Sequence, residues 1–246
     1  MKIVAIIPAR MDSSRFPGKP LAKINGLPMI QRVYKNVKKN KLLLDVVVAT
    51  CDKIIFNFMK SINGNVVMTS KKHKRASDRC CEAMKILEKK RKIKYDIVLM
   101  VQGDEPMINS KMISDAIRPM LKNKKINITN LICPIKNKND FEDPNFVKVV
   151  HDKKYNALYF SRAIIPYAKF KSSINIKKQV CAIPFRRDFL AKYNKMKPTK
   201  LEKVESIDML RLLENGYKIL LVKTKKLVHS VDTKKDLLRV EKYLKK

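Results

Sequence analysis

The stretch Ile3-Val-Ala-Ile-Ile-Pro-Ala-Arg-Met-Asp-Ser-Ser-Arg-Phe-Pro-Gly-Lys-Pro20 decides how the rest of this chain is interpreted. Its apolar, β-branched start, residues 3–7, is closed by Pro8 and predicts a buried strand. A polar loop follows, and its cations and hydroxyls are Arg10, Ser13, Ser14, Arg15 and Lys19. Because α/β proteins bind phosphates where a strand feeds such a loop, the stretch predicts a phosphate site. It matches neither the Walker A nor the GxGxxG pattern.

The composition predicts a globular protein with a sizeable core, since the chain has 246 residues and is 45% hydrophobic. Its five cysteines are odd in number and show no CxxC spacing. We interpret them as reduced thiols of a cytosolic protein rather than a disulfide framework or a zinc site. No apolar segment approaches the roughly 20 residues of a spanning helix, and the first is too short for a signal peptide. We therefore expect a cytoplasmic protein without membrane insertion.

The formal net charge of +34 admits two interpretations. Such a charge attracts polyanions, which favours a nucleic-acid or anionic-membrane partner. The alternative is a compositional bias toward lysine, because the cations are spread in ones and twos without a basic tail or an RNA-binding motif. The absence of a motif makes nucleic acid the less favoured partner. The same field would favour a small anionic substrate.

The first half of the chain alternates apolar runs with helical periodicity, which predicts a parallel, doubly wound α/β sheet. The strands are expected at 3–7, 45–50, 66–69 and 95–101, and the helices at 28–39, 54–61, 78–90 and 112–121. Right-handed crossovers would bring the loops after the first, third and fourth strands to one edge of the sheet.

The pattern changes after the fourth helix. Strands expected at 128–135, 147–151, 157–160 and 180–185 have little helix between them, which predicts an antiparallel excursion over about 128–185. A helix over 200–213 is expected to turn Leu201, Val204, Ile207 and Leu210 inward, and 217–222 is expected to be a strand. Thr233 and Asp236 have the spacing of a capping box that opens the last helix. Without repeats or a linker, residues 1–246 are predicted to form a single domain.

Two aspartates are candidate ligands of Mg²⁺. Asp104 stands in the turn Gln102-Gly-Asp-Glu-Pro106 directly after a predicted buried strand, and carboxylates at such strand ends are suitable ligands for a hard cation. A simple turn residue is the alternative for Asp104, but the nearby cationic loop favours metal. Asp232 is the second candidate, and its local sequence fits a residue beside a helix cap equally well.

Two further segments carry cations in predicted loops. The loop His73-Lys-Arg-Ala-Ser-Asp-Arg79 would follow the third strand, where its arginines would reach a base or a phosphate; taken alone, a solvated basic loop explains it better. Arg162 joins a strand to a proline-containing turn, where a guanidinium would pair with a substrate carboxylate. His151 and His229 have no catalytic partner at a recognisable spacing and are interpreted as structural.

The motifs taken together resemble those of a known family. They are IIPARMDSSRFPGKPL (6–21), VVMTS (66–70), HKRASDR (73–79), VQGDEP (101–106), DPNFVKVV (143–150), ALYFSRAIIP (157–166), LLENGYKI (212–219) and VDTKKDL (231–237). Their order is similar to that of the 3-deoxy-manno-octulosonate (Kdo) cytidylyltransferases, or CMP-Kdo synthetases, which are relatives of the CMP-sialate synthetases. The resemblance implies a three-layer α/β/α fold of the nucleotide-diphospho-sugar-transferase type, a homodimer, and a role in cell-surface polysaccharide synthesis. The implied reaction joins CTP to a 2-keto-3-deoxy sugar acid with Mg²⁺ as cofactor.

The resemblance also implies roles for particular residues. Lys19, Arg10 and Asp104 would be catalytic, and Asp104 and Asp232 would hold Mg²⁺. The nucleotide would be bound by Arg10, Ser14, Arg15, Lys19, His73, Arg75, Ala76, Ser77, Arg79 and Gln102. The sugar acid would be bound by Gln102, Arg162, Gln179, Phe185, Glu205, Asp208 and Met209.

The chain departs from the family's pattern where the sugar is expected to bind. A strand that reads H-x-G-x-Y-x-[YF] in the family is Gln179-Val-Cys-Ala-Ile-Pro-Phe185 here, and a Glu-Gln pair becomes Asp208-Met209. An unmatched polar contact can change specificity by orders of magnitude. Kdo is therefore the leading acceptor, with 8-amino-Kdo or a sialic-type acid as the alternative. A nucleotidyltransferase that uses another nucleotide, or a non-catalytic basic nucleic-acid-binding protein, remains a less favoured interpretation.

Overall fold

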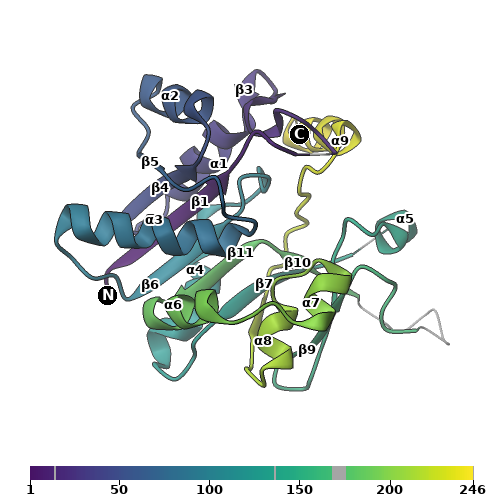
Figure 1. The fold of residues 1–246 in the computed structure, drawn as a ribbon. Helices are drawn as coiled ribbons and strands as arrows, with labels where there is room; N and C mark the ends of the chain where they lie inside the picture. The colour runs from purple at the N-terminus through teal and green to yellow at the C-terminus, as the bar shows by residue number, and fades with distance from the viewer. Residues whose placement is uncertain (14, 136, 168–175, 246) are drawn as a thin grey trace.

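The computed structural model describes residues 1–13, 15–135, 137–167 and 176–245, and two five-stranded sheets dominate it (Figure 1). The first sheet has the strand order β11-β6-β1-β4-β5. Its strands are β1 (Ile3–Ala9), β4 (Asp45–Thr50), β5 (Val66–Met68), β6 (Ile97–Val101) and β11 (Ala182–Arg186). The first four are parallel and β11 is antiparallel to β6. The predicted parallel α/β sheet is confirmed.

Helices cover both faces of the first sheet, which explains why β1 is apolar along its whole length. Val4 and Ile6 face the side covered by α3 (Ala76–Arg91), whereas Ala5 and Ile7 face α1 (Met29–Lys38) and α4 (Ser110–Lys122). All seven residues of β1 are buried as a result. The remaining helices of this half are η1 (Lys19–Leu21) and α2 (Lys53–Ser61), and the hairpin strands are β2 (Lys23–Ile24) and β3 (Leu27–Pro28).

The second sheet has the order β12-β7-β10-β8-β9 and corrects the prediction for residues 180–185. Its strands are β7 (Thr129–Pro134), β8 (Lys148–His151), β9 (Ala157–Ser161), β10 (Lys177–Val180) and β12 (Leu220–Lys223). The expected single strand at 180–185 is wrong, because the chain leaves the second sheet at Val180 and enters the first sheet at Ala182. The excursion is otherwise antiparallel as expected, and β12 adds to β7 in parallel.

The predicted helix over 200–213 is broken into α7 (Lys200–Glu205) and α8 (Leu210–Glu214). Ser206 between them has a φ of 53°, which ends the first helix. Of the four positions expected to face inward, Ile207 and Leu210 are buried as predicted, whereas Leu201 and Val204 are 40% and 83% exposed. Glu202 is buried as well, because it forms a salt bridge with the buried Arg211.

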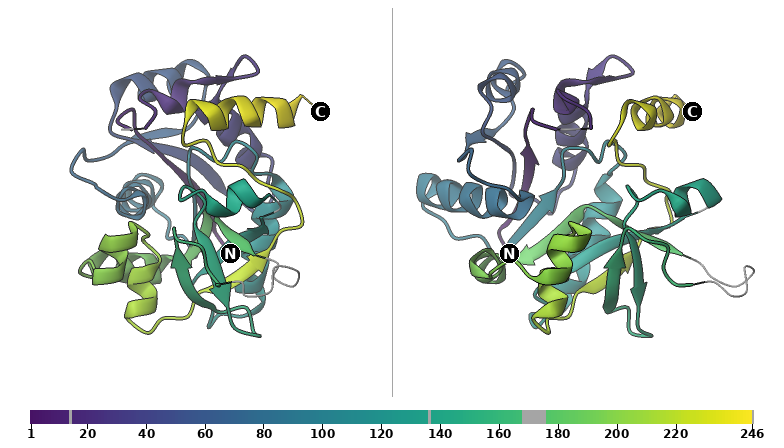
Figure 2. Two further views of the ribbon diagram at one scale, coloured as in Figure 1. Left: turned by 90° about the vertical axis from the view of Figure 1, so that its right-hand side faces the viewer. Right: turned by 45° about the vertical axis from the view of Figure 1, so that its right-hand side comes forward.

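The last helix, α9 (Lys234–Leu244), crosses back to the N-terminal half, where it lies beside the β2–β3 hairpin (Figure 2). The capping box of Thr233 and Asp236 is confirmed. Arg239 of α9 forms a paired salt bridge with Asp140 of α5 (Lys138–Glu142), at 2.6 and 2.7 Å. The segment before α9 is tied to the turn after β6, because the backbone N–H of Val231 donates to the Asp104 carbonyl at 2.9 Å. The remaining helix, α6 (Arg187–Lys195), follows β11.

Residues of both sheets share one hydrophobic cluster, which includes Val98 of β6 and Phe160 of β9. An isolated bridge between Ile128 and Phe185 also joins the sheets. These contacts support the single-domain organisation, which stays a prediction. In the described part of the chain, no helix combines the length and the apolar character needed to cross a bilayer.

Candidate active site

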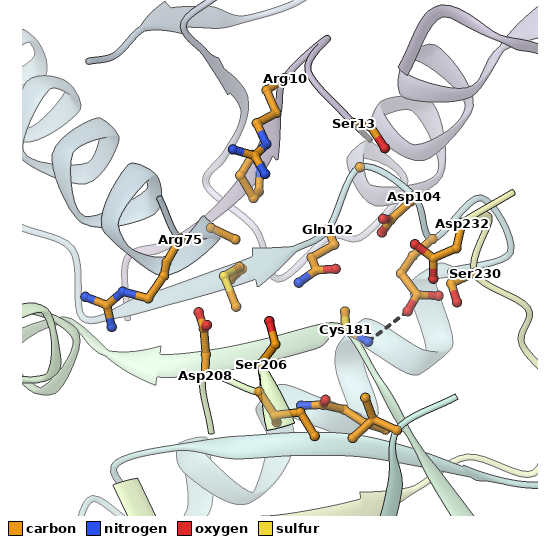
Figure 3. A pocket seen from close by; sticks show the side chains of 18 of the residues that line it. Arg10, Ser13, Arg75, Gln102, Asp104, Cys181, Ser206, Asp208, Ser230 and Asp232 are labelled. Carbon is orange, nitrogen blue, oxygen red and sulfur yellow. Dashed lines mark hydrogen bonds between the residues drawn. The ribbon is translucent and has the colours of Figure 1, made fainter. Parts of the chain in front are cut away.

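A cavity of about 720 Å³ lies between the carboxyl ends of β1 and β6, the second sheet and the α7–α8 segment (Figure 3). Residues from distant parts of the chain line it, as expected for the carboxyl edge of a parallel sheet. Those that the sequence predicted are Arg10, Arg15, Lys19, His73, Arg75, Ala76, Arg79, Gln102, Asp104, Arg162, Gln179, Asp208, Met209 and Asp232. The loops after the first, third and fourth predicted strands therefore meet at one site.

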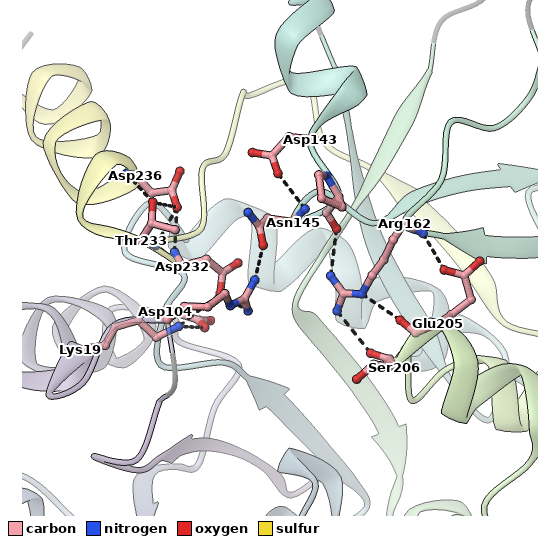
Figure 4. Close-up of polar contacts among 12 residues, drawn as sticks. Lys19, Asp104, Asp143, Asn145, Arg162, Glu205, Ser206, Asp232, Thr233 and Asp236 are labelled. Carbon is pink, nitrogen blue, oxygen red and sulfur yellow. Dashed lines mark hydrogen bonds and ion pairs between the residues drawn. The ribbon is translucent and has the colours of Figure 1, made fainter.

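Lys19 lies between the two predicted metal ligands (Figure 4). Its Nζ is 2.6 Å from Oδ2 of Asp104 and 3.4 Å from Oδ1 of Asp232. Burial lowers the pKa of Lys19, but the two carboxylates outweigh burial and raise the pKa above its usual value. Arg15 adds a second cation, 2.9 Å from Oδ1 of Asp232, and also donates a hydrogen bond to Asn145.

The two carboxylates suit Mg²⁺. Burial, and then the charge of Asp104, raise the pKa of Asp232. The Oδ1 atom of Asp104 is buried and has no hydrogen-bond partner among the described residues. The described residues contain no group of three or more metal-ligating side chains. Proteins hold Mg²⁺ by one or two carboxylates together with substrate phosphates, and Asp104 and Asp232 could supply such a pair.

Glu105, next to Asp104, was not singled out from the sequence. It is buried, and its Oε1 accepts a 2.9 Å hydrogen bond from the backbone N–H of Cys181, where the chain crosses between the sheets (Figure 3). Burial raises the pKa of Glu105 to about 7. The turn after β6 is thus tied to the crossover.

The segment 73–79 is more structured than a loop, because α3 already begins at Ala76. His73 Nε2 is 2.5 Å from Glu82, and Arg79, only 4% exposed, donates to Thr69 at 2.5 Å. Arg75 pairs with Asp78 through two hydrogen bonds of 2.6 and 3.1 Å. Arg75, Ala76 and Arg79 all line the cavity, but the Arg79 guanidinium is already bound to Thr69 and to the Ser70 carbonyl.

Ser77 is a correction, because it is fully buried and binds a neighbouring side chain instead of lining the cavity. Its hydroxyl donates to Asp208 at 3.2 Å. Burial raises the pKa of Asp208, whose carboxylate faces the cavity (Figure 3). Met209 also lines the cavity. Ser77 accordingly fixes a residue of the predicted sugar side.

A buried ion pair below this wall escaped the sequence analysis. Arg211 is fully buried and forms two hydrogen bonds to Glu202, of 2.6 and 2.5 Å, and one to the Met196 carbonyl. The guanidinium groups of Arg75 and Arg211 both lie over the ring of Tyr193. The acidic residues of this segment recur at three-residue spacing, and this pattern alone could not show which of them would be buried.

Arg162 is used differently from the prediction. Its guanidinium donates to the carbonyls of Glu205 (2.8 Å), Pro144 (2.9 Å) and Ser206 (3.3 Å), so it joins two segments of the cavity wall (Figure 4). The carboxylate of Glu205 accepts from Ser161 Oγ at 2.6 Å and from the Arg162 backbone at 2.9 Å. Both residues hold the cavity wall together, and a carboxylate clamp at Arg162 would have to use its remaining donors.

Of the remaining predicted residues, one lines the cavity, one lies in the core and one is not described. Gln179 lines the cavity and donates a 2.6 Å hydrogen bond to Asn130. Phe185 is a correction, because it is fully buried and stacks on Tyr193 in the core, with ring centroids 5.9 Å apart. Ile183 of the same strand lines the cavity and pairs with Met100, whereas Phe185 pairs with Val98, farther from the carboxyl end of β6. Ser14 lies outside the described residues.

Comparisons with known proteins agree with this geometry. The sequence profile of the cytidylyltransferase family matches residues 4–220. The 3-deoxy-manno-octulosonate cytidylyltransferase of Fusobacterium nucleatum is 40% identical over 245 residues, which cover 100% of this chain and 98% of that protein. The enzyme of the same name from Geobacter sulfurreducens is 41% identical over 256 residues, covering 100% of both chains.

Solved structures give the same result. A CMP:2-keto-3-deoxy-manno-octonic acid synthetase complexed with CTP has a TM-score of 0.89 and 33% identity, over 100% of this chain and 99% of that one. A 4-diphosphocytidyl-2C-methyl-D-erythritol synthase from Anaerococcus prevotii has a TM-score of 0.65 at 14% identity, over 100% and 96%. The second similarity concerns the fold alone.

Proposed function

Because this chain belongs to the cytidylyltransferase family, in its 3-deoxy-manno-octulosonate branch, we propose that it joins CTP to a 2-keto-3-deoxy sugar acid. The products are the CMP-sugar and pyrophosphate. The observation that carries this proposal is the meeting of Arg15, Lys19, Asp104 and Asp232 at one end of a cavity large enough for a nucleotide and a sugar. The enzyme is thus a nucleotidyltransferase.

The cationic end of the cavity is the place for the CTP triphosphate. Lys19 and Arg15 already lie against carboxylates, so phosphate oxygens would compete for the same ammonium and guanidinium groups. Arg10 extends the same positive edge. Positioning and charge neutralisation are the main requirements of phosphoryl transfer, because its transition state needs little covalent help.

The reaction forms one bond and breaks one. The anomeric hydroxyl oxygen of the sugar acid attacks the α-phosphorus of CTP, the bond from that phosphorus to the bridging oxygen breaks, and the hydroxyl proton is released. Lys19 stabilises charge on the α-phosphoryl group. Asp104 and Asp232 would hold Mg²⁺, which when bound neutralises the pyrophosphate leaving group and activates the attacking hydroxyl.

Kdo is the leading acceptor, since Kdo is the sugar in the names of the relatives. Gln179, Asp208 and Met209, at which this chain departs from the family's pattern, all line the cavity. A carboxylate there can accept hydrogen bonds from hydroxyl or ammonium groups of a sugar. 8-Amino-Kdo or a sialic-type acid is therefore the alternative acceptor.

The remaining expectations belong to this proposal. A cytoplasmic homodimer that acts in lipopolysaccharide or other cell-surface polysaccharide synthesis is consistent with the relatives named above. Pairing of this chain with a second copy is measured by light scattering, for which the expected mass is twice 28.6 kDa.

The direct experiment measures pyrophosphate release from CTP with Kdo, 8-amino-Kdo and N-acetylneuraminate, each with and without Mg²⁺. Release that needs CTP, Mg²⁺ and one of these acids supports the proposal. UTP and GTP are the controls for nucleotide choice. The fastest rate with Kdo would show that Gln179, Asp208 and Met209 leave sugar selection unchanged.

The non-catalytic alternative has its own signature. A basic nucleic-acid-binding protein would bind DNA or RNA at physiological salt with an affinity that falls steeply as salt is raised. Such binding, together with no pyrophosphate release from CTP with any of the three acids, would overturn the proposal.

A further inference from the structure

Lys148, at the start of β8, is fully buried although it lies in none of the salt bridges formed by the described residues. Its ammonium donates to two backbone carbonyls instead, those of Asp143 at 3.0 Å and Arg162 at 2.5 Å. Burial lowers its pKa. A charge placed there is costly unless it is well hydrogen-bonded, so its position calls for an explanation.

The two carbonyls belong to segments that meet at the mouth of the cavity. The first is the turn 143–145, in which the Asp143 carboxylate accepts from the Asn145 backbone at 2.8 Å. The Arg162 guanidinium donates to Pro144 of the same turn at 2.9 Å (Figure 4). Two cations, Lys148 of β8 and Arg162 just after β9, therefore hold the backbone of this turn.

The turn 143–145 also contacts the N-terminal half of the chain. The side chain of Asn145 accepts a hydrogen bond from Arg15, and the same guanidinium pairs with Asp232. A continuous path of hydrogen bonds thus runs from Lys148 through the turn 143–145 to the cation expected to hold the CTP phosphates.

We propose that Lys148 is a positioning residue for CTP binding: it fixes the turn 143–145 so that Asn145 holds the Arg15 guanidinium at the cavity. This inference rests on the proposed function. It predicts that Lys148 acts on the nucleotide only through Asn145. A guanidinium that is already oriented loses less conformational entropy when it binds a phosphate. Removing Lys148 should therefore weaken the affinity for CTP.

The test is a double-mutant cycle of Lys148→Met and Asn145→Ala, measured by steady-state kinetics in CTP and by calorimetric CTP binding. Each single variant is expected to raise the KM and the Kd for CTP about tenfold, the effect of losing one hydrogen bond to a charged group. The double variant is expected to show the same tenfold loss, because both changes break one path. The kcat at saturating CTP is expected to stay within about twofold of the wild-type value, because the lost interaction binds the ground state and the transition state equally.

Lys178→Met is the matched control. Lys178 is the register partner of Lys148 on the neighbouring strand and is also buried, at 4% exposure, but its Nζ lies 3.8 Å from the centre of the Phe146 ring. Methionine keeps a favourable contact with an aromatic ring, so this variant should leave the KM for CTP unchanged. Combined with Asn145→Ala, it should give only the loss of Asn145→Ala.

The outcomes separate the proposals. A lower kcat with an unchanged KM for CTP in Lys148→Met would mean that Lys148 only supports folding, and would overturn the inference. Independent effects of Lys148→Met and Asn145→Ala, multiplying in the double variant, would also overturn it while leaving the proposed function intact. A wild-type protein that does not bind CTP would overturn both.

Discussion

The Nζ of Lys19 lies 2.6 Å from Oδ2 of Asp104, so the residue expected to act on the α-phosphoryl group and a residue expected to hold Mg²⁺ neutralise each other in this structure. Asp232 completes the arrangement at 3.4 Å. Bound substrate would have to rearrange these partners, with phosphate oxygens replacing carboxylates around Lys19. Two predictions follow from this pair.

Asp104→Asn should lower kcat/KM for pyrophosphate release at least about a hundredfold, because a neutral amide is a poor ligand for Mg²⁺. The fold should persist, which circular dichroism and thermal melting will check. Asp188→Asn, at a side chain that is 73% exposed, is the control and should retain wild-type rates. Substantial turnover by Asp104→Asn would refute the metal role.

Lys19→Met should change Mn²⁺ affinity in opposite directions depending on the nucleotide. Without CTP, removal of the ammonium leaves two adjacent carboxylates without their bridging cation, so Mn²⁺ should bind about tenfold more tightly. With CTP, loss of a phosphate contact should weaken formation of the ternary complex. Electron paramagnetic resonance of free Mn²⁺ measures both, and unchanged affinity without CTP would contradict the prediction.

Arg211→Met should destabilise the fold by about 3 to 5 kcal/mol, because it leaves the buried carboxylate of Glu202 without its partner. Urea unfolding gives the free energy. Arg118→Met removes a guanidinium from a side chain that is 61% exposed and should cost less than about 0.5 kcal/mol. Equal losses of unfolding free energy in the two variants would show that the buried pair of Arg211 and Glu202 stabilises the fold no more than an exposed pair does.

His229 should make the protein less stable as the pH falls from about 6.5 to about 4. Burial lowers its pKa from 6.5 to about 4 in the folded protein. The unfolded state therefore binds the proton first, so the stability present above pH 6.5 is lost on acidification, by about 3 kcal/mol in full.

His229→Phe should remove this part of the pH dependence, because neither ring nitrogen has a hydrogen-bond partner among the described residues and the ring stacks on Tyr243. Urea unfolding at pH 5 and pH 7.5 compares the variant with the wild type. His151→Phe, at a partly exposed position, is the control and should keep the wild-type difference. An unchanged pH dependence in His229→Phe would argue against the buried neutral imidazole.

The sequence predicted the local structure of the first half of the chain well, because strands and helices depend on short-range patterns of apolar residues. The apolar runs 3–7 and 45–50 form neighbouring parallel strands. The capping box of Thr233 and Asp236 begins α9, as expected. The cationic loop and Asp104 were also predicted to share a site, since parallel strands present their carboxyl ends at one edge.

The prediction was weakest where partners are distant in sequence. The apolar spacing over 200–213 predicted the burial of Ile207 and Leu210 correctly, but Leu201 and Val204 are exposed. Glu202 is buried in that first turn instead, because it pairs with the buried Arg211. Phe185 was expected beside the sugar, but its strand joined β6 and buried it. Arg162 lines the cavity as expected, but nothing in the sequence indicated that its guanidinium also donates to three carbonyls of the chain.

The sequence by itself therefore determined the fold class and the nucleotide chemistry, and it predicted which residues carry the charges of the site. Tertiary structure alone decided which of those charges are free for substrate and which are consumed by the protein. Lys148 shows the reason: its neighbours in sequence give no sign that it is buried, and its partners, the carbonyls of Asp143 and Arg162, become available only when two separate segments meet. Local propensity acts within a few residues, whereas burial and hydrogen-bond satisfaction depend on the whole packed chain.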